Sequence, residues 1–98
     1  MKFSWSGRKR AANIKAHGLD FLDAPRVFEG LTFTFEDDRF AYGEQRFVTL
    51  GLLSGVVVSI VHVVVSIVHT ESEVEICVIS FRKATKREEA IYFSQVQD

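Results

Sequence analysis

Four basic residues stand close together near the end of the chain and could bind an anion. Arg82 and Lys83 are expected at the end of a strand, and Lys86 and Arg87 follow shortly after them. The residues from Thr85 onward fit a capping box, which predicts that a helix begins there. Helix N-termini attract anions, whereas cations in the first helical turn oppose the helix dipole. This cost favours a phosphate-binding site over the alternative, an ordinary solvated surface.

Glu44 and Arg46 form a second candidate group. They are two positions apart, so in a strand both side chains would point to the same face. They could supply an acid or base and a phosphate clamp. The alternative, which the spacing alone slightly favours, is a structural ion pair. His69 could act as a general acid or base near neutral pH, or it could be a strand-end histidine bonded to the backbone.

These residues would be positioned by an α+β domain with an antiparallel sheet of four to five strands. Alternating apolar residues predict strands over 31–36, 47–53 and 74–78, with a weaker strand over 2–5 and a valine-rich strand from residue 56. Two helices are expected before the main strands, and one helix after them.

The first helix should run over 7–17, with Ser6 as its N-cap and Gly18 after its end. The second should run from an Asp20 cap to Phe28, although Pro25 would break it unless the helix starts just before the proline. In the C-terminal helix we expect Ala90, Ile91 and Phe93 to face the sheet.

The valine-rich strand contains a tandem duplication. Residues 56–62 read Val-Val-Val-Ser-Ile-Val-His and are repeated unchanged at 63–69. Because side chains alternate in a strand, an odd shift of seven would put His62 and His69 on opposite faces. One strand over 56–70 would span roughly 50 Å at about 3.3 Å per residue, far beyond usual strand lengths. We expect one copy to form the ladder strand, and the other to bulge, overhang or pair outside the domain.

The composition indicates one domain over residues 1–98, with 47% hydrophobic residues to form a core. A single cysteine fits a reducing compartment, and therefore the cytoplasm, while the apolar run is too short and polar for a membrane span. The three histidines and the cysteine lack metal-binding spacing, so we expect no metal and no cofactor.

The formal net charge of −1 gives no bulk attraction to nucleic acid. The charges are nevertheless segregated, because residues 1–18 contain five basic residues and no acid, and the middle of the chain contains Glu36, Asp37 and Asp38. A fold that joined the two basic ends could present one side to RNA and another to a basic partner.

Two segments are distinctive, Tyr42-Gly43-Glu44-Gln45-Arg46-Phe47 and Ile79-Ser80-Phe81-Arg82-Lys83-Ala84-Thr85. Together with Phe3-Ser4-Trp5, the segment over 11–18 and Val68-His69-Thr70, they resemble the BrnT family of type II toxins over nearly the whole chain. The duplicated heptad has no counterpart in that pattern.

The resemblance implies a RelE-like toxin, an endoribonuclease that cleaves RNA without a metal and inhibits translation. It also implies a ribbon-helix-helix antitoxin as partner, with operator DNA bound only through the antitoxin complex. Such cleavage needs a base, an acid and cations that stabilise the phosphorane. The candidate catalytic residues are Arg82, Lys83, Arg46, Glu44 and His69, and the candidate RNA phosphate-binding residues are Lys86 and Arg87.

Two other functions are consistent with the sequence. An insertion beside the site could have left an inactive homologue that only binds an antitoxin. A protein that reads DNA directly is disfavoured by the near-zero net charge and by the lack of a recognition helix.

Overall fold

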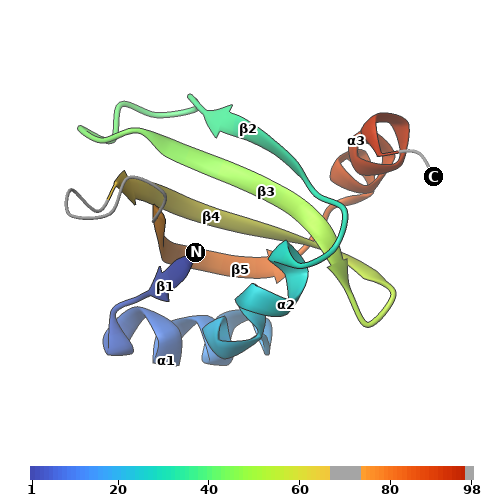
Figure 1. Cartoon of the computed structure of the whole chain (residues 1–98). Helices are drawn as coiled ribbons and strands as arrows, with labels where there is room; N and C mark the ends of the chain where they lie inside the picture. The colour runs from blue at the N-terminus through green and yellow to red at the C-terminus, as the bar shows by residue number, and fades with distance from the viewer. Residues whose placement is uncertain (67–73, 97–98) are drawn as a thin grey trace.

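The computed structural model describes residues 1–66 and 74–96 (Figure 1). Its elements, in chain order, are β1 (Lys2–Ser4), α1 (Gly7–His17), the 3-10 turn η1 (Phe21–Asp23), α2 (Ala24–Phe28), β2 (Phe33–Asp37), β3 (Arg46–Leu53), β4 (Val56–Ser66), β5 (Val74–Lys83) and α3 (Lys86–Gln95). The expected α+β class is confirmed, and β5 runs five residues further than the alternation of 74–78 indicated.

The five strands form one sheet in the order β1-β5-β4-β3-β2. The strands from β2 to β5 pair antiparallel, but β1 runs parallel to β5, with Phe3 opposite Ile76. The expectation of a purely antiparallel sheet was therefore wrong at this edge. A tight turn at Ser54 and Gly55, with φ of 51° and 80°, fixes the direction of β4 against β3. No hairpin joins β1 to β5, so only packing decides the direction of β1.

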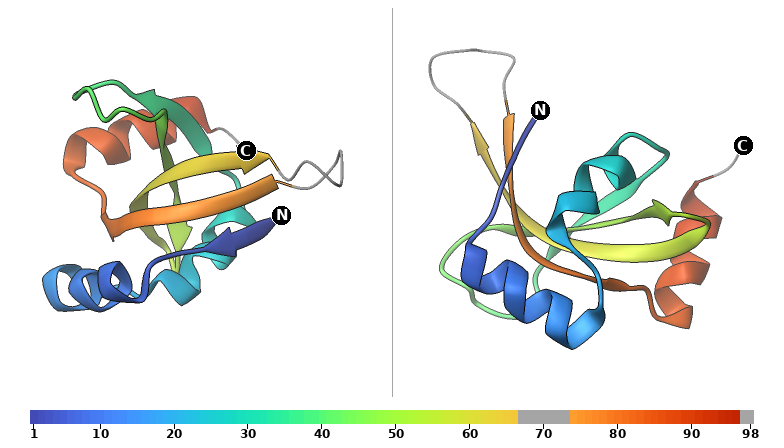
Figure 2. Two further views of the ribbon diagram at one scale, coloured as in Figure 1. Left: turned by 90° about the vertical axis from the view of Figure 1, so that its left-hand side faces the viewer. Right: turned by 90° about the horizontal axis from the view of Figure 1, so that it is seen from below.

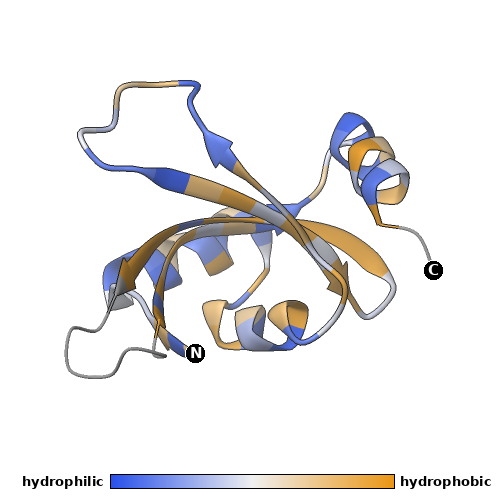
Figure 3. Ribbon diagram, turned by 45° about the horizontal axis from the view of Figure 1, so that its top comes forward, coloured by the Kyte–Doolittle hydropathy of each residue, from blue (hydrophilic) through white to orange (hydrophobic). Residues whose placement is uncertain are grey.

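Helices cover both faces of the sheet (Figure 2). The segment from α1 to α2 lies on one face, where Phe21 and Val27 pack against Ile60, Val78 and Phe81. The α3 helix lies on the other face, where Tyr92 joins a second apolar cluster with residues of β3 and β4. The strands between these layers are mostly hydrophobic, and the hairpin between β2 and β3 is largely polar (Figure 3).

The first helix begins and ends as its sequence predicts. Ser6 accepts a hydrogen bond from the Lys9 amide, and Gly18 ends the helix with φ of 72°. The expected second helix is divided into η1 and α2, because α2 starts one residue before Pro25 and so places the proline in its first turn. The expectation of one helix from Asp20 to Phe28 was therefore wrong in detail.

The buried side chain of Asn13 ties α1 to the end of β5. Its Nδ2 donates to the carbonyl oxygens of Phe81 (2.7 Å) and Leu19 (2.9 Å), and its Oδ1 accepts from the Phe81 amide (3.0 Å). Satisfying these buried backbone groups fixes the position of β5 just before Arg82.

The two heptad copies take different places in the sheet. The first copy, over 56–62, pairs with β3, and from Val58 onward it also pairs with β5. The described part of the second copy, Val63 to Ser66, pairs with β5 and extends past the last pair with β3, Phe47 and His62. The second copy therefore overhangs β3, one of the three outcomes expected, but the expectation that only one copy would join the ladder was wrong, because β4 continues along β5 after a register shift between Val61 and His62. His69 lies outside the described residues.

Within the described part of the chain, no helix is long and apolar enough to cross a membrane.

Candidate functional site

The junction between β5 and α3 holds Arg82 in a fixed position. As the sequence indicated, Thr85 caps α3, because its hydroxyl accepts from the Glu88 amide (3.1 Å) and its own amide donates to Glu88 Oε1 (2.9 Å). Glu88 also binds Arg82 with two hydrogen bonds, from Nη1 to Oε1 (2.8 Å) and from Nη2 to Oε2 (3.0 Å). The capping box therefore positions a functional arginine as well as the helix.

The Arg82 guanidinium retains hydrogen-bonding capacity after these contacts. Nη1 donates a further bond to the Lys83 carbonyl (3.2 Å), so three of the five N–H donors of an arginine are used. Within the described residues the other two, on Nε and Nη2, have no acceptor. These two adjacent donors form the edge that can bind a phosphate through two parallel hydrogen bonds.

The Arg82–Glu88 pair is charged at neutral pH. Burial opposes ionisation of Glu88, but the hydrogen bonds from Arg82 and from the Thr85 amide outweigh it, and the pKa of Glu88 is lowered from its ordinary value. Glu88 therefore remains a carboxylate that orients Arg82.

The other three cations lie around the same junction but not on one surface. Lys86 and Arg87 are exposed in the first turn of α3. The Lys83 side chain lines a hollow with His17 and residues of β3 and β4 on the opposite face of the sheet from Glu88 and α3. Neighbouring residues of a strand point to opposite faces, so Arg82 and Lys83 are separated by the sheet. None of these three side chains forms an ion pair with a described residue.

The hairpin between β2 and β3 holds the second candidate group. Arg46 binds Glu44 Oε1 at 3.2 Å, and its guanidinium carbon lies 4.1 Å from the centre of the Tyr42 ring. The Tyr42 hydroxyl in turn donates to Asp37 Oδ2 (3.0 Å). Arg46 is therefore held by an ion pair and by a cation–π contact.

Asp37 anchors this hairpin from within the sheet. Its buried carboxylate receives two hydrogen bonds from Arg39, at 2.7 and 2.9 Å. These bonds, together with the one from Tyr42, lower the pKa of Asp37 to about 2 although burial opposes the shift. The Asp37 carboxylate therefore stays charged and holds the Tyr42 hydroxyl, and the Tyr42 ring in turn contacts Arg46.

Arg46 and Arg82 project from the same face of the sheet. Arg82 lies opposite Ser59, and Ser59 lies opposite Leu50, which is four residues from Arg46. Two strand spacings and four residues correspond to about 17 Å between their Cα atoms. The strip of sheet between the two arginines includes the cross-strand neighbours Ser80, Val61 and Val48.

Residues 5–88 match the family described as the ribonuclease toxin BrnT of type II toxin–antitoxin systems. The match includes the hairpin and the junction of β5 with α3. The chain belongs to the BrnT family. A comparison with curated proteins found no match. The resemblance inferred from the motifs is confirmed, and with it membership of a family of ribonuclease toxins that operate together with antitoxins.

The histidine that this BrnT-family chain places in the sheet is His62, in the first heptad copy. Its Nε2 lies 2.8 Å from Thr49 Oγ1, and its ring lies between Phe47 and Phe28 on the face covered by α2. Burial lowers the pKa of His62 to about 4, so the ring is neutral at pH 7. The side chain is also buried, so RNA cannot reach it. The candidate acid or base His69 lies outside the described residues.

Across residues 1–66 and 74–96, no group of three or more His, Cys, Asp or Glu side chains could hold a metal ion.

Sequence reasoning missed two positioning contacts. The capping box indicated where Glu88 lies, but its bond to Arg82 depends on how α3 folds back against β5. The Tyr42–Arg46 contact could have been suggested by the spacing within one motif, but its link to Asp37 crosses the hairpin.

Proposed function

We propose that the chain is an endoribonuclease toxin that cleaves RNA without a metal ion and thereby inhibits translation. Its partner is a ribbon-helix-helix antitoxin, and operator DNA is bound only through the complex of the two. The observation that carries the proposal is the orientation of Arg82 by Glu88, which leaves two adjacent donors without an acceptor among the described residues, beside the exposed cations of α3. Membership of the BrnT family supplies the class of substrate.

In this reaction the ribose 2′-oxygen attacks the neighbouring phosphate and the 5′-oxygen leaves. Negative charge develops on the non-bridging oxygens, so fixed donors aimed at them lower the barrier. We assign this role to Arg82. Lys86 and Arg87 bind flanking phosphates, and Lys83, on the opposite face, binds the incoming RNA rather than the reacting phosphate.

Glu44 and Arg46 complete the proposed site from the hairpin. Glu44 is exposed, and a glutamate side chain can accept the 2′ proton, while Arg46 can bind the phosphate from the side opposite Arg82. The reacting phosphate would lie between the two guanidinium groups, outside the apolar side chains that bury Val48 and Val61 in this strip. His69 remains a candidate for the acid that protonates the leaving oxygen.

A cleavage assay tests the proposal. The purified protein is incubated with a defined messenger RNA in EDTA, with and without ribosomes, beside the variants Arg82→Ala and Lys15→Ala. Lys15 is an exposed cation of α1, on the opposite face of the sheet from Arg82 and α3, so its loss changes the net charge equally without touching the proposed site.

We expect the wild type and Lys15→Ala to cleave the RNA and Arg82→Ala to lose at least about 100-fold, the usual effect of removing one oxyanion donor. Cleavage at the wild-type rate by Arg82→Ala would remove Arg82 from the mechanism. Intact RNA in every lane, with antitoxin binding retained, would instead indicate an inactive homologue that acts only as a binding module.

A further inference from the structure

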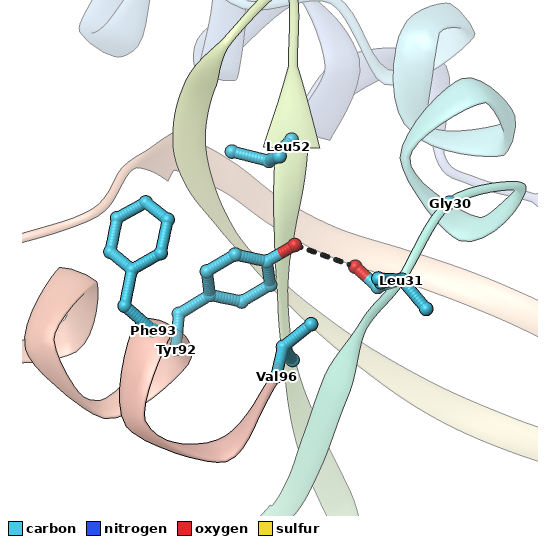
Figure 4. A pocket seen from close by; sticks show the side chains of 6 residues that line it. All are labelled: Gly30, Leu31, Leu52, Tyr92, Phe93 and Val96. Atoms are coloured by element: carbon cyan, nitrogen blue, oxygen red, sulfur yellow. Dashed lines mark hydrogen bonds between the residues drawn. The ribbon is translucent and has the colours of Figure 1, made fainter. Parts of the chain in front are cut away.

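An apolar hollow opens between the C-terminal end of α3 and the turn that leads into β2. It has a volume of about 200 Å³ and is lined by Gly30, Leu31, Leu52, Tyr92, Phe93 and Val96 (Figure 4). The Tyr92 hydroxyl donates to the Leu31 carbonyl (2.9 Å), which holds α3 against this turn. A cavity of about 150 Å³ accommodates benzene, so the hollow suits one large apolar side chain.

Three large apolar side chains at the rim of the hollow are exposed to solvent. Phe93 is 59% exposed, Leu31 57% and Leu52 42%. The expectation that Ile91 faces the sheet is confirmed, but Ala90 and Phe93 point outward, because α3 turns Tyr92 inward beside Ile91. A cluster of large exposed apolar side chains marks an interaction site rather than scattered surface residues.

The outward face of α3 joins this hollow to the cationic junction. Lys86, Ala90 and Phe93 are all exposed and follow the spacing i, i+4, i+7, so they lie along one stripe. The stripe is about 10 Å long at 1.5 Å per residue. It is apolar at Phe93, narrow at Ala90 and positively charged at Lys86, with Arg87 beside it.

We propose that this stripe docks a helical segment of the antitoxin. One large apolar side chain of the antitoxin enters the hollow, and carboxylates about two helical turns away bind Lys86 and Arg87. The small side chain of Ala90 lets a second helix approach between these two contacts. The positive charge at one end requires an acidic segment, and the type II family supplies a protein partner.

A protein segment fits the hollow better than RNA does. The side chains that line it are leucine, valine, phenylalanine and Tyr92, and the Tyr92 hydroxyl already donates to the Leu31 carbonyl. A nucleobase inserted there would lose water from its hydrogen-bonding edges without gaining partners from these side chains. An aliphatic or aromatic side chain loses no such bonds.

The proposal also explains how the antitoxin would neutralise the toxin, and this part rests on the proposed function. Lys86 and Arg87 are the cations assigned to RNA phosphates. An antitoxin helix whose carboxylates occupy them would exclude RNA from the junction, while its anchor in the hollow would supply affinity without touching the RNA site.

The test is a calorimetric titration of the full chain with its cognate type II antitoxin at two salt concentrations. The variants are Phe93→Ser in the hollow, Lys86→Glu at the cationic end, and Leu22→Ser as a control. Leu22 is 55% exposed, nearly as much as Phe93, but belongs to η1 on the opposite face of the sheet.

We expect Phe93→Ser to weaken antitoxin binding at least 50-fold and Leu22→Ser to leave it unchanged, since a central aromatic anchor carries much of an interface. Lys86→Glu should weaken it about tenfold and reduce its salt dependence. In the absence of antitoxin, Phe93→Ser should cleave RNA like the wild type.

Unchanged antitoxin affinity in Phe93→Ser would overturn the proposal. So would sedimentation in which the wild type is a dimer and Phe93→Ser is a monomer, or a loss of RNA binding in Phe93→Ser. Because binding is measured separately from cleavage, a wild type that binds antitoxin through Phe93 but cuts no RNA would refute the proposed function and leave this docking surface standing.

Discussion

Acidification should destabilise the fold through His62. This side chain is 2% exposed, and its Nδ1 has no hydrogen-bond partner within the described residues. Its Nε2 belongs to a short chain of hydrogen bonds with Thr49 (2.8 Å) and, through it, with Thr34 (2.7 Å). A proton added to the ring would create a charge among Phe28, Phe47 and the strand backbone, with no carboxylate beside it.

The size of the effect follows from the difference in pKa between the two states. Burial lowers the pKa of His62 from 6.5 to about 4, so the unfolded chain takes up the proton at higher pH than the folded one. Stability is therefore complete above pH 6.5 and falls as the pH drops toward 4. At about 1.4 kcal/mol per pKa unit, a change from pH 7.5 to 4.5 should remove roughly 2–3 kcal/mol of unfolding free energy.

Urea unfolding of the wild type and of His62→Gln at both pH values measures this. Trp5 is a suitable probe, because it is half-buried and its ring packs edge-on against Phe21. Glutamine can keep the bond to Thr49 but cannot titrate. The unfolding free energy of His62→Gln should therefore fall less on acidification than that of the wild type, by most of the roughly 2–3 kcal/mol expected for His62. Asp20 and Asp37, with pKa values of about 2, titrate below the window in both proteins. An equal loss in both proteins would refute the assignment to His62.

Two further predictions concern the site and the duplication. Glu88→Gln should reduce RNA cleavage about tenfold by releasing Arg82, whereas Thr85→Val should cost about 1 kcal/mol of stability as a lost cap but leave the cleavage rate of the folded protein nearly unchanged. Initial rates on a denaturing gel compare the two, and a similar loss in both would mean that Glu88 acts only through the helix. Deleting residues 63–69 gives the same chain as deleting 56–62 and leaves one complete copy to pair with β3. The unfolding free energy of the shortened chain should then change by no more than roughly 1 kcal/mol, and a non-cooperative urea transition would show that the overhang is needed for the fold.

Patterns that involve only near neighbours were read correctly from the sequence. Ser6 and Gly18 delimit α1, and Thr85 opens α3, because capping depends on residues within one turn of the helix. The sequence left open which heptad copy would overhang, and the turn at Ser54-Gly55, which sets where β4 begins, placed the first copy against β3.

Contacts between distant parts of the chain could not be read in this way. Whether Phe93 points outward and Tyr92 inward depends on how α3 rotates against the sheet. Gly51 shows the same limit, because a Cβ there would lie 2.6 Å from Val27 Cγ1, and only the packing of α2 on β3 reveals it.

The sequence by itself determined which segments become strands and helices, and which residue types could bind a phosphate. Only the tertiary structure decided that β1 runs parallel to β5, that Arg82 and Lys83 lie on opposite faces, and that Glu88 orients Arg82. The physical reason is that a local pattern needs only the hydrogen bonds of a few neighbouring residues. Sheet order and helix rotation instead depend on burying apolar surface from the whole chain at once.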